Sequence, residues 1–169
     1  MTTAEQIIEL FGMKPLPSEG GYYTETYRCP QKMTQAELPT GYIGERNFST
    51  AILYLLTPET FSALHRVGSD EVFHFYLGGP VTMLQLHSDG TSKVITLGHD
   101  ILNGQRVQAV VPAGTWRGCF LNQGGRFALM GTTVSPGFDF DDFEPARREQ
   151  LLARYPDQSN LILKLTRRQ

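Results

Sequence analysis

Apolar and polar residues alternate with a period of two along most of this 169-residue chain. The alternation comes in short runs separated by glycine, proline, asparagine and aspartate, which is typical of β-strands joined by turns. The runs that predict strands are 21–28, 48–56, 60–66, 71–77, 81–87, 92–97, 107–111, 116–121 and 126–134. No helical pattern lies between these runs, so an all-β fold is expected: a sandwich, a jelly roll or a small barrel.

Helical spacing appears only near the two ends of the chain. Thr3 and Gln6 have the spacing of a capping box, and the apolar residues that follow predict a short amphipathic helix. Near the other end, Asp142 is expected to cap a helix that carries Pro145 in its first turn and packs against the barrel. The polar, weakly patterned segment 29–46 is expected to form an excursion or a lid at the barrel mouth.

The composition indicates one globular domain over residues 1–169, with 40% hydrophobic and 19% charged residues. A net charge of −2 offers no broad basic surface, so nucleic acid is not an expected partner. No window reaches the ~18 consecutive apolar residues of a membrane helix, and we expect no membrane association. The two cysteines are far apart in the sequence, and the chain begins without a leader-like pattern. These features predict a cytoplasmic protein.

The segment 65–78 places a histidine and a carboxylate at opposite ends of a turn between two predicted strands. It resembles the first motif of the cupin superfamily, H-x-H-x(3,4)-E-x(6)-G. His65, Glu71 and Gly78 stand where that motif has its first histidine, its glutamate and its glycine. Val67 stands in place of the second histidine, so one expected metal ligand is missing from this motif.

The second cupin motif, P-x-G-x(2)-H-x(3)-N, is echoed by residues 112–117, with Arg117 in place of the histidine. A catalytic metal generally needs three protein ligands, and an arginine at this position would repel a divalent cation. We therefore expect no cofactor. The alternative left open is a weak or adventitious divalent metal held by His65, Glu71 and His74. Strand alternation puts His74 on the face opposite Glu71, and only a bulge would bring it round.

Other stretches resemble a group of short bacterial and fungal cupins classed as a domain of unknown function and compared with deoxysugar nucleotide epimerases. These stretches are 18–23, 25–28, 49–56, 111–116 and 135–143. The resemblance spans nearly the whole chain. It implies a double-stranded β-helix (jelly-roll barrel) with a short N-terminal helix, a C-terminal helix, a pocket inside the barrel and a homodimer. It implies no established reaction.

Three residues are the candidates for catalysis in this pocket. His65 has the side chain of a general base at neutral pH, and Glu71 lies beside it in the motif. A tyrosine is the expected proton donor on the opposite face of the substrate, with Tyr76 as the first choice and Tyr54 or Tyr23 as alternatives.

The expected ligand-binding residues are Glu19, Ser49, Phe73, Trp116 and Arg117. Backbone amides near Glu19 could approach a ligand, and Trp116 could stack on a sugar or a base. Strand alternation allows only one of Trp116 and Arg117 to face the pocket. An inward Arg117 would favour an anionic substrate through paired hydrogen bonds.

Three functional hypotheses follow. The first is a metal-independent isomerase or epimerase acting on a carbohydrate or a nucleotide-sugar, since a depleted metal site leaves histidine and tyrosine to move protons. The second is a non-catalytic module that binds a small molecule for sensing or storage. The third is a metal-dependent cupin enzyme, which requires His74 to join the first two ligands.

Overall fold

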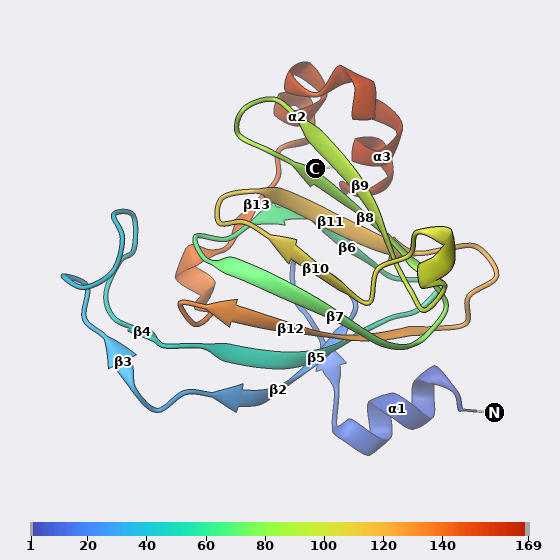
Figure 1. Ribbon diagram of the computed structural model, residues 1–169, viewed down its shortest axis with the longest axis horizontal. Helices are drawn as coiled ribbons and strands as arrows, with labels where there is room; N and C mark the ends of the chain where they lie inside the picture. The colour runs from blue at the N-terminus through green and yellow to red at the C-terminus, as the bar shows by residue number, and fades with distance from the viewer. Residues whose placement is uncertain (1, 168–169) are drawn as a thin grey trace.

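The structure, a computed structural model that describes residues 2–167, consists of two β-sheets that face each other as the walls of a barrel (Figure 1). The larger sheet contains, in spatial order, β1 (Lys14–Pro15), β2 (Tyr22–Arg28), β5 (Thr50–Leu56), β12 (Ala128–Ser135), β7 (Asp70–Gly78) and β10 (Gln108–Val111). The smaller sheet contains β13 (Glu144–Pro145), β6 (Phe61–Arg66), β11 (Trp116–Leu121), β8 (Val81–Leu86) and β9 (Ser92–Leu97). Neighbouring strands run antiparallel in both sheets.

Each of the nine predicted runs coincides with one of the long strands, so the all-β prediction is confirmed. Strands β9 and β11 have the predicted ends, and the ends of the other strands differ from the predicted ones by at most two residues. The two-residue strands were not predicted, because a pair of residues carries no periodicity. They include a separate ladder of β3 (Lys32–Met33) and β4 (Arg46–Asn47) in the excursion after β2.

The inward faces of the two sheets meet in one apolar core. Phe73, Met83, Leu97 and Met130 are fully buried in it, together with Leu56. These residues come from β7, β8, β9, β12 and β5, and alternate side chains on each strand point between the sheets. The core fills most of the barrel, so the free space in the interior is small.

Helix α1 (Ala4–Phe11) packs on the outer face of the larger sheet (Figure 1). The predicted capping box is present: the Thr3 hydroxyl accepts from the Gln6 amide, and the Gln6 side chain accepts from the Thr3 amide. Ile7 packs against Leu55 and Leu129 of the sheet. The helix thus closes one part of an outer face that would otherwise expose apolar side chains.

Helices α2 (Arg148–Arg154) and α3 (Ser159–Lys164) cover the outer face of the smaller sheet, as the C-terminal helix prediction expected (Figure 1). Leu151 and Ile162 pack there against Leu64 and Leu84. The described part of the chain also contains three short 3-10 helices: η1 (Ile101–Asn103), η2 (Phe140–Asp142) and η3 (Pro156–Gln158). None of the helices within residues 2–167 is long and apolar enough to cross a membrane.

The predicted start of the C-terminal helix was wrong. Asp142 ends η2, Pro145 lies in β13, and α2 begins only at Arg148. The Asp142 carboxylate accepts two hydrogen bonds of 2.8 Å from the Arg46 guanidinium, and both side chains are buried. A buried, paired carboxylate forms stronger hydrogen bonds with a guanidinium than with helix amides, which explains why Asp142 does not act as a cap.

The excursion at residues 29–46 lies at one end of the barrel, where Arg46 joins it to Asp142 (Figure 1). The Tyr42 hydroxyl also donates to the Gly68 carbonyl at 2.7 Å and lies 2.8 Å from the Ser69 hydroxyl. These contacts fasten the excursion to the turn between β6 and β7. It contributes no side chain to the cavity described below, whereas the segment after β12 contributes Phe138, Asp139 and Phe140.

Candidate functional site

A cavity of about 250 Å³ lies inside the barrel between the two sheets. Its apolar wall consists of Leu16, Tyr23, Ile52, Tyr54, Val134, Phe138 and Phe140. Its charged lining consists of Glu19, Glu25, Arg28, Glu71, Arg117 and Asp139. The cavity is smaller than the ~300–1,000 Å³ common for sites of drug-sized ligands, so its volume suits a molecule of metabolite size.

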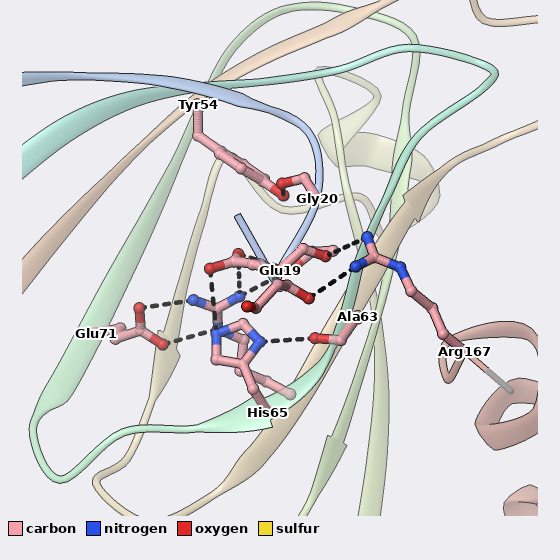
Figure 2. A network of polar contacts seen from close by, with 10 residues as sticks. Glu19, Gly20, Tyr54, Ala63, His65, Glu71 and Arg167 are labelled. Atoms are coloured by element: carbon pink, nitrogen blue, oxygen red, sulfur yellow. Dashed lines mark hydrogen bonds and ion pairs between the residues drawn. The ribbon is translucent and has the colours of Figure 1, made fainter. Parts of the chain in front are cut away.

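Glu19 enters the barrel from a tight turn that precedes β2. Ser18 and Gly20 have φ values of 63° and 108°, and a Cβ at Gly20 would lie 2.3 Å from the Phe61 carbonyl oxygen. Only glycine fits at this position. The Glu19 carbonyl accepts from the Ala63 amide at 2.9 Å, and the Tyr54 hydroxyl donates to the Gly20 carbonyl at 2.7 Å (Figure 2). The turn thus holds a buried carboxylate against the smaller sheet.

A β-bulge in β6 brings two polar side chains to the same inner face. The register with β11 pairs His65 with Arg117 but Ser62 with Cys119, so β6 has one extra residue between the two pairs. In a regular strand, residues three apart would face opposite sides of the sheet. The bulge turns both Ser62 and His65 inward. It also leaves the Ala63 amide free of the β11 ladder, so that this amide donates to the Glu19 carbonyl.

Arg117 on β11 is the centre of the polar cluster. Its Nε and Nη2 atoms donate to the two carboxylate oxygens of Glu71, each at 2.8 Å. Its Nη1 atom donates to Glu19 Oε1 and to Ser62 Oγ, each at 2.9 Å. The guanidinium also lies over the Phe73 ring, 5.0 Å from its centroid. Such paired, charge-assisted hydrogen bonds fix the plane of the guanidinium and of both carboxylates.

His65 lies beside this cluster and is 1% exposed (Figure 2). Its Nδ1 atom is 2.6 Å from the Ala63 carbonyl oxygen, and its ring packs against the Phe143 ring with centroids 4.7 Å apart. Its Nε2 atom has no hydrogen-bond partner within residues 2–167 and lies 3.4 Å from Glu19 Oε2. A buried polar atom of this kind is rare in folded proteins and requires an explanation.

Burial and the neighbouring charges set the protonation of the cluster. Burial lowers the pKa of His65, and the positive charge of Arg117 lowers it further. Burial alone would raise the pKa of Glu19, but Arg117 and the hydrogen bonds to this carboxylate hold it below its ordinary value. Glu19 is therefore ionised at neutral pH and His65 is uncharged.

The structure brings together four of the residues predicted from the sequence. Glu19, Glu71 and Arg117 line the cavity, and His65 contacts Glu19 from behind without lining the cavity itself. Phe73, which was predicted to bind the ligand, lies beneath the guanidinium in the core and does not line the cavity. Arg117 faces inward, which answers the question that strand alternation left open.

Other predicted residues lie elsewhere. Tyr76 and His74 are on the outer face of β7, where their rings stack and His74 Nε2 lies 3.2 Å from the Thr133 hydroxyl. Trp116 packs under the C-terminal helices on the outside of the smaller sheet. Ser49 does not line the cavity. These placements correct the expectation that Tyr76, Trp116 and Ser49 reach the pocket, because each side chain follows the outward phase of its strand or lies before the strand begins.

Several residues of the polar cluster and of the cavity lining were not predicted. Ser62 was hidden by the bulge, which reverses the face that alternation assigns to it. Phe138 and Asp139 come from the segment after β12, and Arg28 comes from the end of β2. Both segments belong to the stretches that carry the family resemblance, and that resemblance was the one sequence signal that could have found them. Arg28 joins the two segments, since it donates to Glu25 and to the Phe138 carbonyl.

Two facing antiparallel sheets around a small cavity with apolar and charged lining define the class of the double-stranded β-helix barrels. The sequence comparison gives the family: the chain belongs to the cupin superfamily, family DUF985, which it matches over residues 5–146. It is 35% identical over 132 residues to the uncharacterized protein YML079W of Saccharomyces cerevisiae. That alignment covers 73% of this chain and 66% of the yeast protein, so the chain spans just under two thirds of this relative.

Solved structures support the same fold. Protein SO0799 from Shewanella oneidensis is 35% identical, with a TM-score of 0.86 and full coverage of both chains. A hypothetical protein from Leishmania major is 30% identical, with a TM-score of 0.88 over 99% of this chain and 100% of that chain. Oxalate decarboxylase of B. subtilis is 18% identical, with a TM-score of 0.53 over 92% of this chain and 38% of that chain. This last similarity concerns the fold alone.

The residues at the metal-motif positions of the barrel do not fit a divalent metal. Both oxygens of Glu71 accept hydrogen bonds from Arg117, and Val67 offers no donor atom. His74 points away from the cavity on the other face of β7. Within residues 2–167, no group of three or more His, Cys, Asp or Glu side chains could hold a metal ion. The guanidinium of Arg117 is the positive charge beside Glu71 and Glu19.

Proposed function

We propose that the protein is a metal-independent isomerase that moves a proton within a small hydroxylated carbonyl compound, such as a free sugar, bound in the barrel cavity. The observation that carries the proposal is the position of His65 Nε2. This nitrogen is buried, has no hydrogen-bond partner within the described residues and faces the ionised carboxylate of Glu19 at 3.4 Å.

The tautomer of His65 follows from its contacts. The Ala63 carbonyl can only accept, so the Nδ1 atom at 2.6 Å must carry the hydrogen. Because His65 is uncharged, Nε2 presents a lone pair to Glu19 Oε2, which also presents lone pairs. Two facing acceptors repel each other until a proton lies between them. The pair of Glu19 and His65 is therefore an acceptor for one proton.

Glu19 is the member of the pair that can touch a substrate, since it lines the cavity and His65 does not. In the proposed step, Glu19 Oε2 takes the proton from the carbon next to the substrate carbonyl. The electrons of that C–H bond form a C=C bond, and the carbonyl oxygen takes the negative charge. The one N–H of Arg117 that is not bonded within the cluster then stabilises this oxygen. The proton then returns to the former carbonyl carbon, and the hydroxyl proton on the neighbouring carbon moves to the negatively charged oxygen. The carbonyl group is now on the neighbouring carbon, which completes the isomerisation.

His65 acts in this scheme as a positioning residue. The proton taken by Glu19 lies between Glu19 Oε2 and His65 Nε2. The lone pair of Nε2 accepts a hydrogen bond from the protonated carboxyl group and so stabilises it. This assignment replaces the earlier role of His65 as the direct base. Among the tyrosines first considered as acids, Tyr54 already donates to the Gly20 carbonyl and has a pKa well above its ordinary value. Tyr23 is the tyrosine that lines the cavity without such a bond in the described residues.

The cavity volume favours a free sugar over a nucleotide-sugar, because about 250 Å³ is small for a base, a ribose and a diphosphate together with a second sugar. A second candidate function is ligand binding without turnover. Four of the five N–H groups of Arg117 are already bonded to protein atoms, so only one is left to stabilise a negatively charged oxygen during a reaction.

The test follows deuterium incorporation by NMR when the full chain is incubated with a panel of aldoses and ketoses in D₂O. The wild-type protein should exchange the hydrogen next to the carbonyl of its substrate, with or without a chelator. E19Q should lose this exchange, and H65N should lose about 10²-fold to 10⁴-fold. E45Q is the matched control, since Glu45 is an exposed partner of Lys32 outside the cavity.

The pH profile separates a positioning role of His65 from a structural one. The exchange rate should fall as the pH drops through the pKa of His65, which lies below its ordinary value of 6.5. H65N should remove this fall. Exchange by E19Q at the wild-type rate would refute the proposed base. Sugar binding without exchange by the wild-type protein would support the second candidate function instead.

A further inference from the structure

The charges around the cavity indicate what kind of molecule it accepts. We propose that the ligand is a small hydroxylated amine, such as an amino sugar, which binds as a cation and in preference to a carboxylate or a phosphate. This inference rests on the proposed function of the same cavity, because it names the substrate class, and it replaces the earlier expectation that an inward Arg117 selects an anion.

The base of the cavity contains more negative than positive charge. Glu19 and Glu71 each contribute a carboxylate. Among residues 2–167, Arg117 contributes the guanidinium that forms ion pairs with them. The nearby His65 imidazole is uncharged and offers a lone pair. Arg167 approaches the same turn, but its guanidinium donates to the main-chain carbonyls of residues 18 and 19. One buried negative charge at the base therefore has no matching positive charge in direct contact, which is unfavourable until a cation arrives.

The mouth of the cavity has the same imbalance. Glu25 and Arg28 form an ion pair of 2.7 Å, and Asp139 adds a second carboxylate to the lining. Asp139 Oδ1 accepts from the Asp141 amide at 2.9 Å, and its other oxygen has no further hydrogen bond in the described part of the chain. The lining as a whole contains four carboxylates and two guanidinium groups.

An anionic ligand would find few hydrogen-bond donors. All five N–H groups of Arg28 are bonded: two to Glu25, one to Asn47 and two to the Phe138 carbonyl. Arg117 has one N–H group left. A carboxylate or phosphate brings several acceptor oxygens that must be desolvated on entry. The lining offers them one free guanidinium N–H and neutral hydroxyls such as those of Tyr23 and Thr132, and it offers no cation with two free N–H groups.

A cationic amine finds matching groups in the same space. Each ionised carboxylate has about four lone-pair positions, so Glu71 keeps free positions after it accepts twice from Arg117. Aromatic rings of Tyr23, Phe138 and Phe140 also line the cavity. Carboxylates beside aromatic faces are a favourable environment for an ammonium group, which binds both by hydrogen bonds and by cation–π attraction.

The test uses three sugars of the same size and different charge: D-glucosamine, D-glucose and D-glucuronate. Binding to the full chain is measured by isothermal titration calorimetry at pH 6.5, where the amine is protonated. D-glucosamine should bind about tenfold more tightly than D-glucose, and D-glucuronate should bind most weakly. The affinity for D-glucosamine should fall as salt is added, while that for D-glucose should not. Equal binding of all three, tightest binding of the acid, or binding of none would overturn the proposal.

A variant at the mouth tests the assignment to this cavity. D139N keeps the oxygen that accepts from the Asp141 amide and removes one negative charge. It should weaken D-glucosamine binding by up to about fivefold, which is more than it weakens D-glucose binding. E45Q, which removes an exposed carboxylate far from the lining, should change neither affinity. An equal loss of D-glucosamine affinity in both variants would show a general charge effect and overturn the cavity assignment.

Binding and deuterium exchange together separate the proposed preference for a cation from the proposed isomerase reaction. Deuterium exchange of a neutral or an anionic sugar, without exchange of D-glucosamine, would support proton transfer and refute the preference for a cation. Tight binding of D-glucosamine without exchange would support the preference and refute the reaction.

Discussion

The buried ion cluster permits a quantitative prediction for R117M. Methionine has a similar length and no charge, so the variant leaves the carboxylates of Glu19 and Glu71 facing each other without the guanidinium between them. Removing one partner of a buried ion pair typically costs about 3–5 kcal/mol. We therefore expect the free energy of unfolding to fall by about this amount, which for a chain of this size corresponds to a decrease in Tm of roughly 6–20 °C.

The assay is urea unfolding at pH 8, followed by circular dichroism, with K32M as the matched control. Lys32 pairs with Glu45 at the surface, where both side chains are about half exposed. Such exposed pairs contribute about 0–1 kcal/mol, so K32M should unfold close to the wild-type midpoint. The two variants differ mainly in whether the lost cation is buried.

The pH dependence provides a second check with a defined sign. In the wild-type protein the pKa of Glu19 lies below its ordinary value of 4.5, so its stabilising contribution is present above that pH and is lost as the pH falls through the lower folded-state pKa. In R117M, burial without the guanidinium raises the Glu19 pKa above 4.5. Protonation of Glu19 then removes its uncompensated negative charge in R117M. The difference in the free energy of unfolding between the wild type and R117M should therefore shrink as the pH falls from 8 toward 4.5.

Two results would refute this reasoning. If R117M loses less than about 1 kcal/mol, the cluster is not the buried, charge-coupled unit that the geometry indicates. If its loss of stability is independent of pH, the carboxylates are not the source of the destabilisation.

Three further predictions concern other parts of the molecule. G20A should lose at least about 2 kcal/mol in urea unfolding, since a Cβ there meets the Phe61 carbonyl at 2.3 Å and φ is 108°; wild-type stability would contradict the described turn. Cys119 is fully buried, and burial raises its pKa to about 12, so mass spectrometry should find it unmodified by iodoacetamide at pH 8 until the chain unfolds. If the expected homodimer forms through the outer face of β7 and β10, Y76E and V110E should sediment as monomers and the wild type as a dimer; dimeric variants would exclude that face.

The fold could be predicted because its determinants are local. Period-two alternation and turn residues occur within each strand and each hairpin, and no distant contact is needed to recognise them. The start of the C-terminal helix was predicted wrongly because its local signals were outweighed by a distant one. Asp142 and Pro145 have the residue types of a helix start, but Arg46 binds the carboxylate from a point 96 residues away in the chain.

The site could be predicted in part. Glu19, Glu71 and Arg117 were found from the family motifs and the stretches near them. The inward positions of His65 and Ser62, and the backbone contact of Ala63 with the Glu19 turn, depend on a bulge in β6 that no period reveals. That bulge also hid Ser62. Strand alternation shows that Trp116 and Arg117 face opposite sides of the sheet, but it does not show which of the two faces the pocket. The same alternation separates Tyr76 from Glu71, and it already argued against Tyr76 as a pocket residue.

The position of Arg117 affects how the barrel acquires its internal positive charge. A guanidinium on the chain is present in every folded molecule, in a fixed ratio of one per chain, and it arrives with folding itself. It cannot dissociate on dilution, be removed by a competing ligand or be exchanged for another ion. The positive charge at the base of this barrel is therefore encoded in the sequence and does not depend on the concentration of any ion in the surroundings.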